Sequence, residues 1–153
     1  WTPHVGGTNL DPSLSYRFHN GRIYSGMTRI VWELNEVVKG QGGTCLVPGS
    51  HKANLASAQE RNWPEAADKP DSGLWETYGC PPGSLVVFSE GTRHTGSTWP
   101  HTGNPRCAIL IAYNHASVRF HEPKPCMNPT VIGGMSEEHQ NFFKDVWVLA
   151  NKR

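Results

Sequence analysis

The sequence predicts a mainly β protein, either a sandwich or a double-stranded β-helix (jelly roll), with a C-terminal helix and one or two short helices. Sixteen Gly and twelve Pro punctuate its 153 residues. They separate six or more short apolar segments, and turn signals recur about every ten residues. Such dense punctuation is typical of many short strands joined by turns, and it disfavours a helical bundle.

Composition predicts one domain over residues 1–153 and excludes several classes of partner. The net charge is +1, and charges of both signs are interspersed, so we expect no nucleic-acid or membrane partner. The four Cys are widely spaced, which favours a reduced, cytoplasmic chain, although two disulfides remain an alternative. Because the chain begins at Trp1, we expect part of the natural N-terminal region to lie outside it.

The first half of the chain reads as strands and turns. Asn20-Gly21 is a strong hairpin signal. Apolar and polar residues alternate in 27–38 (MTRIVWELNEVV), which predicts a strand, with a short helix as the alternative. A short strand is expected at 44–47, and a short helix at 53–61.

The second half contains three further strand signals and one convincing helix. Strands are expected at 74–78, 85–88 and 107–113. Residues 136–150 (SEEHQNFFKDVWVLA) predict a helix, because Ser136 can cap it and its apolar residues form a stripe.

Residues 83–106 suggest a functional hairpin. His94 follows the strand at 85–88, and Arg106 opens the next strand, so both can face one cavity. Imidazole is a common ligand for transition metals, and guanidinium holds a carboxylate through two charge-assisted hydrogen bonds. The pair is therefore a candidate metal ligand and anion clamp. The alternative from this segment alone is a surface His and a surface Arg.

Two motifs together carry a family resemblance. Residues 42–55 (GGTCLVPGSHKANL), joined to the strand, His94 and Arg106 of 83–106, resemble the phytanoyl-CoA dioxygenase family of Fe(II)- and 2-oxoglutarate-dependent oxygenases. The resemblance covers about residues 1–115. It implies a cupin-like double-stranded β-helix that binds iron through a His-Xaa-Asp and a later His. On this resemblance His94 is the later iron ligand, and Arg106 binds the far carboxylate of 2-oxoglutarate.

The first part of the family's ligand motif is altered. No His-Xaa-Asp occurs upstream of residue 42. His4 is the preferred counterpart of the missing His, with Gly6 where the family has Asp, and His19 is the runner-up. Thr28 and Arg29 open the strand that precedes PGSHK and are candidates to face the cofactor pocket, and Thr28 is a further candidate for cofactor binding.

The missing carboxylate leaves three alternatives. Asp11, or Glu90 four residues before His94, completes the metal site; or Gly6 leaves a position that chloride fills, as in related halogenases; or the metal site is degraded. The ranking is hydroxylase, then non-catalytic jelly-roll binding module, then halogenase.

The resulting expectation is an Fe(II)/2-oxoglutarate-dependent dioxygenase. It would hydroxylate an unidentified small molecule through a ferryl species, with His4, His94 and Glu90 as metal ligands and Arg106 as the 2-oxoglutarate clamp. A zinc- or sugar-binding cupin is the rival from another class, and would not need Arg106 as an anion clamp. On the resemblance, His51, within PGSHK, is expected to be a structural or pocket-rim residue and not a metal ligand.

Overall fold

A computed structural model describes residues 2–5, 15–52, 65–100, 103–115 and 128–141. The chain divides into two compact units, Trp1–Asn114 and His115–Arg153, and each is described by itself. All of the described strands belong to the first unit, and both α-helices belong to the second. The mainly β fold predicted from the sequence is confirmed.

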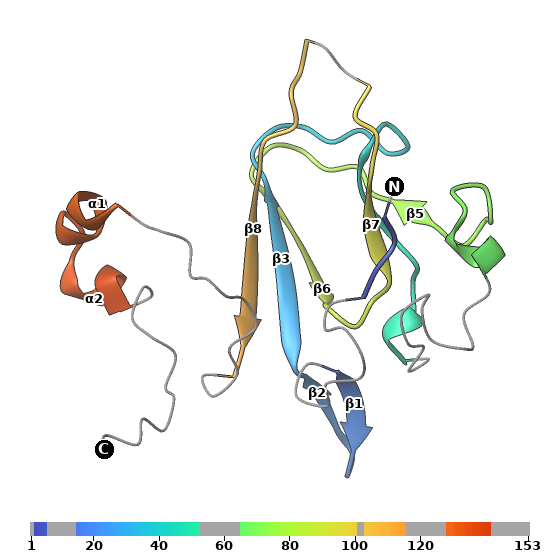
Figure 1. Cartoon of the computed structure of the whole chain (residues 1–153), viewed down its shortest axis with the longest axis horizontal. Helices are drawn as coiled ribbons and strands as arrows, with labels where there is room; N and C mark the ends of the chain where they lie inside the picture. Colours follow the sequence, from blue (N-terminus) through green and yellow to red (C-terminus); the bar gives the residue numbers. More distant parts are fainter. Residues whose placement is uncertain (1, 6–14, 53–64, 101–102, 116–127, 142–153) are drawn as a thin grey trace. The chain divides into compact units, whose positions relative to one another are not determined.

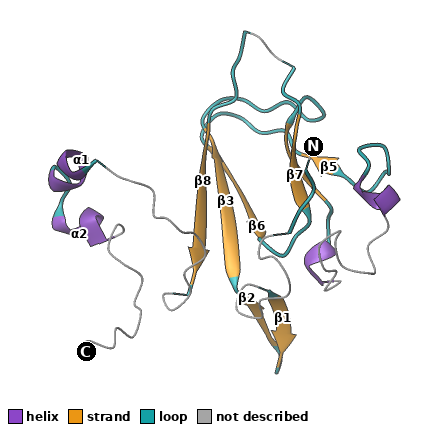
Figure 2. Cartoon of the chain, in the orientation of Figure 1, coloured by secondary structure: helices purple, strands orange, loops and turns teal. Residues whose placement is uncertain are grey.

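Two antiparallel three-stranded sheets make up most of the first unit (Figures 1 and 2). One sheet has β3 at its centre and the other has β4 at its centre. The order in the first is β6 (Ser84–Ser89), β3 (Met27–Glu33), β8 (Ala108–Asn114), and in the second β5 (Glu76–Thr77), β4 (Gly43–Leu46), β7 (His94–Ser97). Sequence-distant segments therefore meet at both central strands.

The central strand β3 has two chemically distinct faces. Met27, Val31 and Glu33 are buried, and they alternate with Trp32, which is exposed. Because side chains alternate along a strand, Arg29 lies on the same face as the buried residues. This inner face carries two ionisable groups, and the opposite face is the more apolar one.

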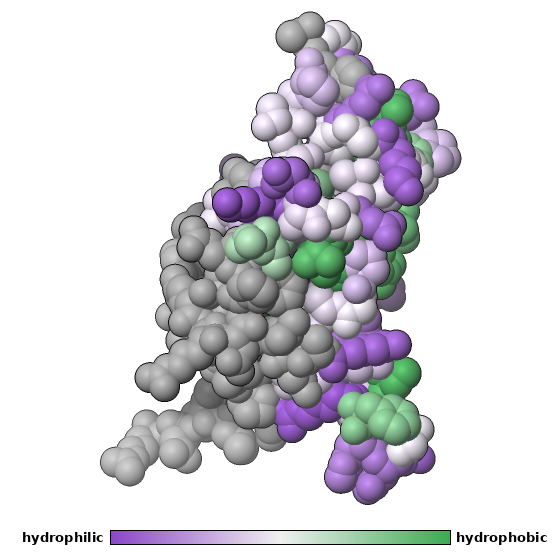
Figure 3. All heavy atoms as spheres, turned by 90° about the vertical axis from the view of Figure 1, so that its right-hand side faces the viewer, coloured by the Kyte–Doolittle hydropathy of each residue, from purple (hydrophilic) through white to green (hydrophobic). Residues whose placement is uncertain are grey.

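A hairpin precedes β3. Strands β1 (Tyr16–His19) and β2 (Arg22–Ser25) pair antiparallel around Asn20 and Gly21, whose φ angles are 49° and 73°. Two positive φ angles match the tight hairpin turn that Asn-Gly predicts, so that prediction is confirmed. The hairpin lies at the foot of the unit in Figure 1, and hydrophobic side chains appear at the lower end of Figure 3.

The other predicted strands are found with small shifts in their ends. The strand expected at 27–38 stops at Glu33. Beyond it the Leu34 N–H still donates to Cys107 O, and Val37 forms a separate bridge with Cys80. The strand expected at 74–78 is shorter, covering only Glu76–Thr77. The PGSHK motif ends in a 3-10 helix, Ser50–Lys52, and a second one spans Glu65–Asp68.

The second unit contains two short helices within its described residues. Helix α1 (Pro129–Gly133) is capped by Asn128, and α2 (Glu137–Gln140) is capped by Ser136. The predicted Ser136 cap is confirmed. Residues 142–150, the remainder of the predicted helix, lie outside the described residues, as does the helix expected at 53–61. Within the described part of the chain, no helix has the length and apolarity needed to cross a membrane.

Candidate metal centre

A tight turn between β6 and β7 brings Glu90 and His94 together. Glu90 directly follows β6, His94 is the first residue of β7, and the Thr92 N–H donates to Ser89 O at 2.8 Å. His94 Nε2 lies 3.5 Å from Glu90 Oε1. Both residues are buried, so the chain reversal places an imidazole and a carboxylate in one sheltered position.

His4 reaches the same position from the N-terminal end of the chain. His4 and His94 form an antiparallel bridge in which each N–H donates to the other residue's carbonyl at 2.9 Å. Directly opposed residues of an antiparallel pair project to the same face. The two rings accordingly lie side by side, with centroids 4.3 Å apart.

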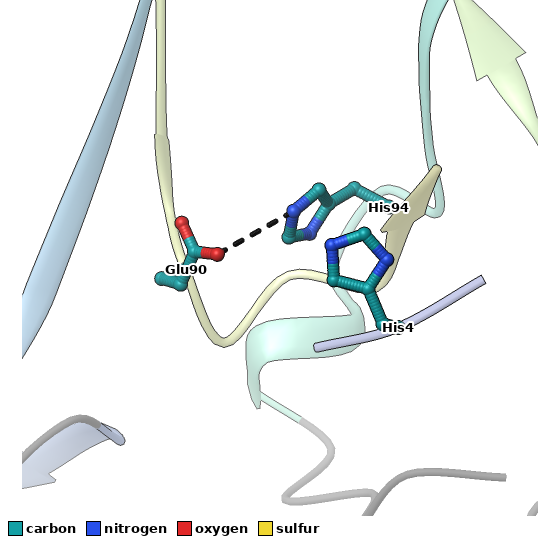
Figure 4. A group of neighbouring side chains, drawn as sticks. All are labelled: His4, Glu90 and His94. Carbon is teal, nitrogen blue, oxygen red and sulfur yellow. Dashed lines mark ion pairs between the residues drawn. The ribbon is translucent and has the colours of Figure 1, made fainter. Parts of the chain in front are cut away.

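The three side chains form a cluster suited to a metal ion (Figure 4). One ligand atom from each of His4, Glu90 and His94 lies within 4.8 Å of the others. Two imidazoles and one carboxylate are the donor set of non-haem Fe(II) oxygenase sites, which leave the remaining positions open. The residues present therefore fit Fe(II).

Hydrogen bonds to the backbone fix the orientation of both imidazoles. His4 Nδ1 lies 2.8 Å from Thr2 O, and His94 Nδ1 lies 2.7 Å from Thr92 O. Each Nδ1 then carries the proton and donates it, which leaves Nε2 with a free lone pair toward the cluster. Burial lowers the pKa of His94 below 6.5, so its ring is neutral at pH 7, as a metal ligand must be.

Arg29 holds the other side of the Glu90 carboxylate. Its Nε donates to Glu90 Oε2 at 2.6 Å, whereas Oε1 is the oxygen nearest His94. Arg29 projects from the inner face of β3, and Glu90 follows β6, whose pairing with β3 aligns them. The guanidinium thus compensates the buried negative charge and leaves one carboxylate oxygen for a metal.

A second polar cluster surrounds Arg106, just before β8. Arg106 Nη2 donates to Glu33 Oε1 at 2.5 Å and to Thr44 Oγ1 at 3.1 Å, and Arg106 Nε donates to Glu33 Oε2 at 3.3 Å. The Tyr78 hydroxyl donates to Glu33 Oε1 at 2.6 Å. Burial and the Glu33 bond raise the pKa of Tyr78 to about 12, so it remains a donor. The predicted anion clamp therefore faces a carboxylate of its own chain.

The remaining predicted residues lie apart from the metal cluster or outside the described residues. Thr28 faces the outer side of β3, where its hydroxyl donates to Ser25 Oγ at 3.3 Å, so the structure does not bring it to the cluster. The runner-up ligand His19 is exposed at the end of β1. His51 packs edge-on against Tyr16. Gly6 and Asp11 fall outside the described residues.

Sequence reasoning missed the partners of Arg106 and of Glu90. Glu33 and Tyr78 were not recognised as neighbours of Arg106, and the contact between Arg29 and Glu90 was not foreseen. One signal was available: Arg29 and Glu33 share a strand face with Val31, and charges on a buried face require partners.

Comparisons with known proteins place the chain in a family and show a shared fold. A family model described as "Phytanoyl-CoA dioxygenase (PhyH)" matches residues 2–106. The solved structure of HygX from Streptomyces hygroscopicus with nickel and 2-oxoglutarate bound is similar, at 22% identity and a TM-score of 0.57, covering 74% of this chain and 50% of HygX. The iron-bound HygX structure is similar at 21% identity and a TM-score of 0.56, covering 74% of this chain and 51% of HygX.

The extent of the HygX matches limits what they establish. The chain spans about half the length of the HygX structures, and identities near 22% establish the fold alone. A search of curated proteins found no match.

Proposed function

Because this chain belongs to the phytanoyl-CoA dioxygenase family, we propose that it is an Fe(II)- and 2-oxoglutarate-dependent oxygenase. Fe(II) and 2-oxoglutarate are the cofactors of that family. The observation that supports the proposal most strongly is the cluster of His4, Glu90 and His94, in which Glu90 and His94 are buried and His4 is exposed. We further propose that the reaction is hydroxylation of a small molecule whose identity is open.

Each residue of the cluster has a defined task in this proposal. Nε2 of His4, Nε2 of His94 and Oε1 of Glu90 would hold the iron. Iron and 2-oxoglutarate together would supply the oxidising chemistry. Arg29 would hold the Glu90 carboxylate in its orientation, and Arg106 would bind the distal carboxylate of 2-oxoglutarate.

Glu90 also bears on the choice between hydroxylation and the alternatives. A vacant position filled by chloride requires that no carboxylate reach the metal. Glu90 Oε1 already lies beside His94, and its ligand atom is within reach of His4 as well. This geometry favours the carboxylate that follows β6, Glu90, in place of the family's Asp, and thus a complete three-ligand set.

Anaerobic titration with Fe(II) and 2-oxoglutarate tests the proposal. Wild type should develop a visible charge-transfer band, and His4→Ala, Glu90→Ala and His94→Ala should each lose it. His19→Ala is the matched control, because His19 is exposed and remote, and it should retain the band.

Other outcomes of this titration would point elsewhere. Loss of the band in His19→Ala but not in His4→Ala would replace His4 as the ligand. A band that depends on chloride and survives Glu90→Ala would support the vacant-site alternative. No band and no succinate formation in wild type would contradict the oxygenase proposal and favour a binding module.

A further inference from the structure

The inner faces of the two sheets connect the metal cluster to Arg106. Arg29, beside Glu90, and Glu33, beside Arg106, are four residues apart on one face of β3, or about 13 Å along the strand. On the second sheet, Thr44 pairs with Gly96, two residues beyond His94. The pairing within each sheet therefore places both clusters on the inner faces of the two sheets.

The space beside Gly96, the residue of β7 that pairs with Thr44, is open. A Cβ built at Gly96 would meet no atom within 4 Å, and it would point to the same side of β7 as His94. A five-carbon diacid that chelates the metal through one end would therefore extend past Gly96 toward Thr44 and Arg106. This step rests on the proposed function, because it takes 2-oxoglutarate as the ligand.

Glu33 occupies one of the two edges through which Arg106 can hold a carboxylate. The Nε and Nη2 groups form that edge, which binds carboxylates through two parallel hydrogen bonds. Both donate to Glu33, at 3.3 Å and 2.5 Å. The Glu33 side chain is wholly buried and is held by Tyr78 as well, whereas that of Arg106 is 24% exposed.

The pair also changes the charge that a ligand encounters. An unpaired guanidinium would attract a carboxylate, but Arg106 and Glu33 together are neutral. An incoming carboxylate must displace Glu33 from Arg106 or bind beside its negative charge, and both options weaken binding. A 2-oxo acid with an uncharged end experiences neither penalty.

We propose that Glu33 is an internal competitor for the distal carboxylate of 2-oxoglutarate, and thereby sets how strongly the protein selects this diacid over 2-oxo acids with an uncharged end. Glu33 touches Arg106 and not the metal cluster. Its effect is therefore confined to the distal end of the ligand.

The test compares two ligands that differ only at that end. Anaerobic Fe(II)-loaded protein is titrated with 2-oxoglutarate and with 2-oxopentanoate, whose methyl group replaces the distal carboxylate, and binding is followed by the charge-transfer band. Glu33→Gln keeps the shape of the side chain and removes its charge. Glu36→Gln, an exposed position on the following turn, is the matched control.

Glu33→Gln should raise the affinity for 2-oxoglutarate about tenfold or more, the scale of a charge-assisted hydrogen bond. Its affinity for 2-oxopentanoate should stay within about twofold of wild type, and Glu36→Gln should change neither. An unchanged or lower preference for 2-oxoglutarate in Glu33→Gln would overturn the proposal, since Glu33 would then serve to hold Arg106 in place.

Two further outcomes keep the test decisive. If Glu33→Gln does not fold, the affinity ratio of wild type for 2-oxoglutarate over 2-oxopentanoate decides. A ratio below about tenfold supports competition by Glu33, and a larger ratio overturns the proposal. If wild type binds neither 2-oxo acid, the proposed function fails and competition fails with it. Binding of both ligands with no change in their ratio rejects the competitor role alone.

Discussion

At the scale of single residues, Glu33 makes Arg106 part of the protein's stability as well as a candidate clamp. Arg106→Leu would leave a wholly buried carboxylate without its cation, with only Tyr78 as a partner. We expect this variant to lose about 3–5 kcal/mol of unfolding free energy. The double variant Arg106→Leu with Glu33→Leu should recover most of that loss. Urea denaturation of the three proteins measures both values.

This prediction decides how a loss of 2-oxoglutarate binding in Arg106→Leu is interpreted. If the single variant unfolds as wild type does, the Glu33 ion pair contributes little to stability, and weak binding reports on the clamp alone. If it is destabilised as expected, only the double variant separates a missing clamp from a disturbed fold.

Tyr78 gives a pH-dependent prediction at the same scale. Its pKa is raised from 10.0 to about 12, chiefly by burial and then by its bond to Glu33. The neutral phenol is favoured in the folded state, so this stabilisation is complete below pH 10 and is lost as the pH rises through 12. The shift corresponds to at most about 3 kcal/mol, which solvent screening at this half-buried site reduces to about 1 kcal/mol.

Urea unfolding at pH 9 and near pH 12 checks this value. Wild type should lose about 1 kcal/mol more than Tyr78→Phe over that interval. Equal losses in the two proteins would mean that Tyr78 titrates in the folded state as it does in the unfolded chain.

At the scale of elements, the turn that enters β4 depends on a close backbone approach at Gly42. A Cβ there would lie 2.8 Å from Thr98 O and 2.8 Å from the Trp99 ring, and φ is +102°. Gly40 has a φ of +81° but no atom within 4 Å. We expect Gly40→Ala to cost about 1–3 kcal/mol from backbone strain alone.

Gly42→Ala should cost clearly more, because strain and collision add. Denaturant unfolding of the two variants separates these terms. Equal costs would show that the loop containing Thr98 and Trp99 moves away without penalty. The approach has a functional consequence, since this turn leads to Thr44 beside Arg106.

The strands and local turns were predictable because their signals lie close together in sequence. Asn20-Gly21 specifies its hairpin, and the spacing of Glu90 and His94 places them across one turn. The sequence could not show that His4 pairs with His94, because that bridge joins segments ninety residues apart and has no local pattern. From the sequence alone, His4 and His19 are both candidates for this ligand, and only the fold places His4 beside His94.

The orientation of β3 was also hidden from local pattern. Strand alternation is unambiguous, but the usual rule would bury Ile30 and Trp32 and expose Arg29 and Glu33. In the fold the charged set faces inward, because Glu90 and Arg106 provide opposite charges there. The same face buries Met27 and Val31, so ion pairing and apolar burial act there together.

At the scale of the whole β unit, the inward orientation of the charged residues of β3 leaves an apolar surface on the outer side of the β6–β3–β8 sheet. Register places apolar side chains in two cross-strand rows on that side: Leu85, Trp32 and Ile109, and Val87, Ile30 and Ile111. Several of them are largely exposed, including Leu85 and Val87. The sheet is thus polar toward the candidate site and apolar on its outer side.

A matched pair of substitutions tests that assignment. Val31 is 1% exposed on the inner face, and Val87 is 58% exposed on the outer face. Val31→Thr places a hydroxyl among buried groups and should cost about 1–3 kcal/mol of unfolding free energy. Val87→Thr is the same chemical change and should stay within about 0.5 kcal/mol of wild type. A larger cost for Val87→Thr would show that the outer face is covered in solution, and sedimentation would reveal whether a second copy covers it.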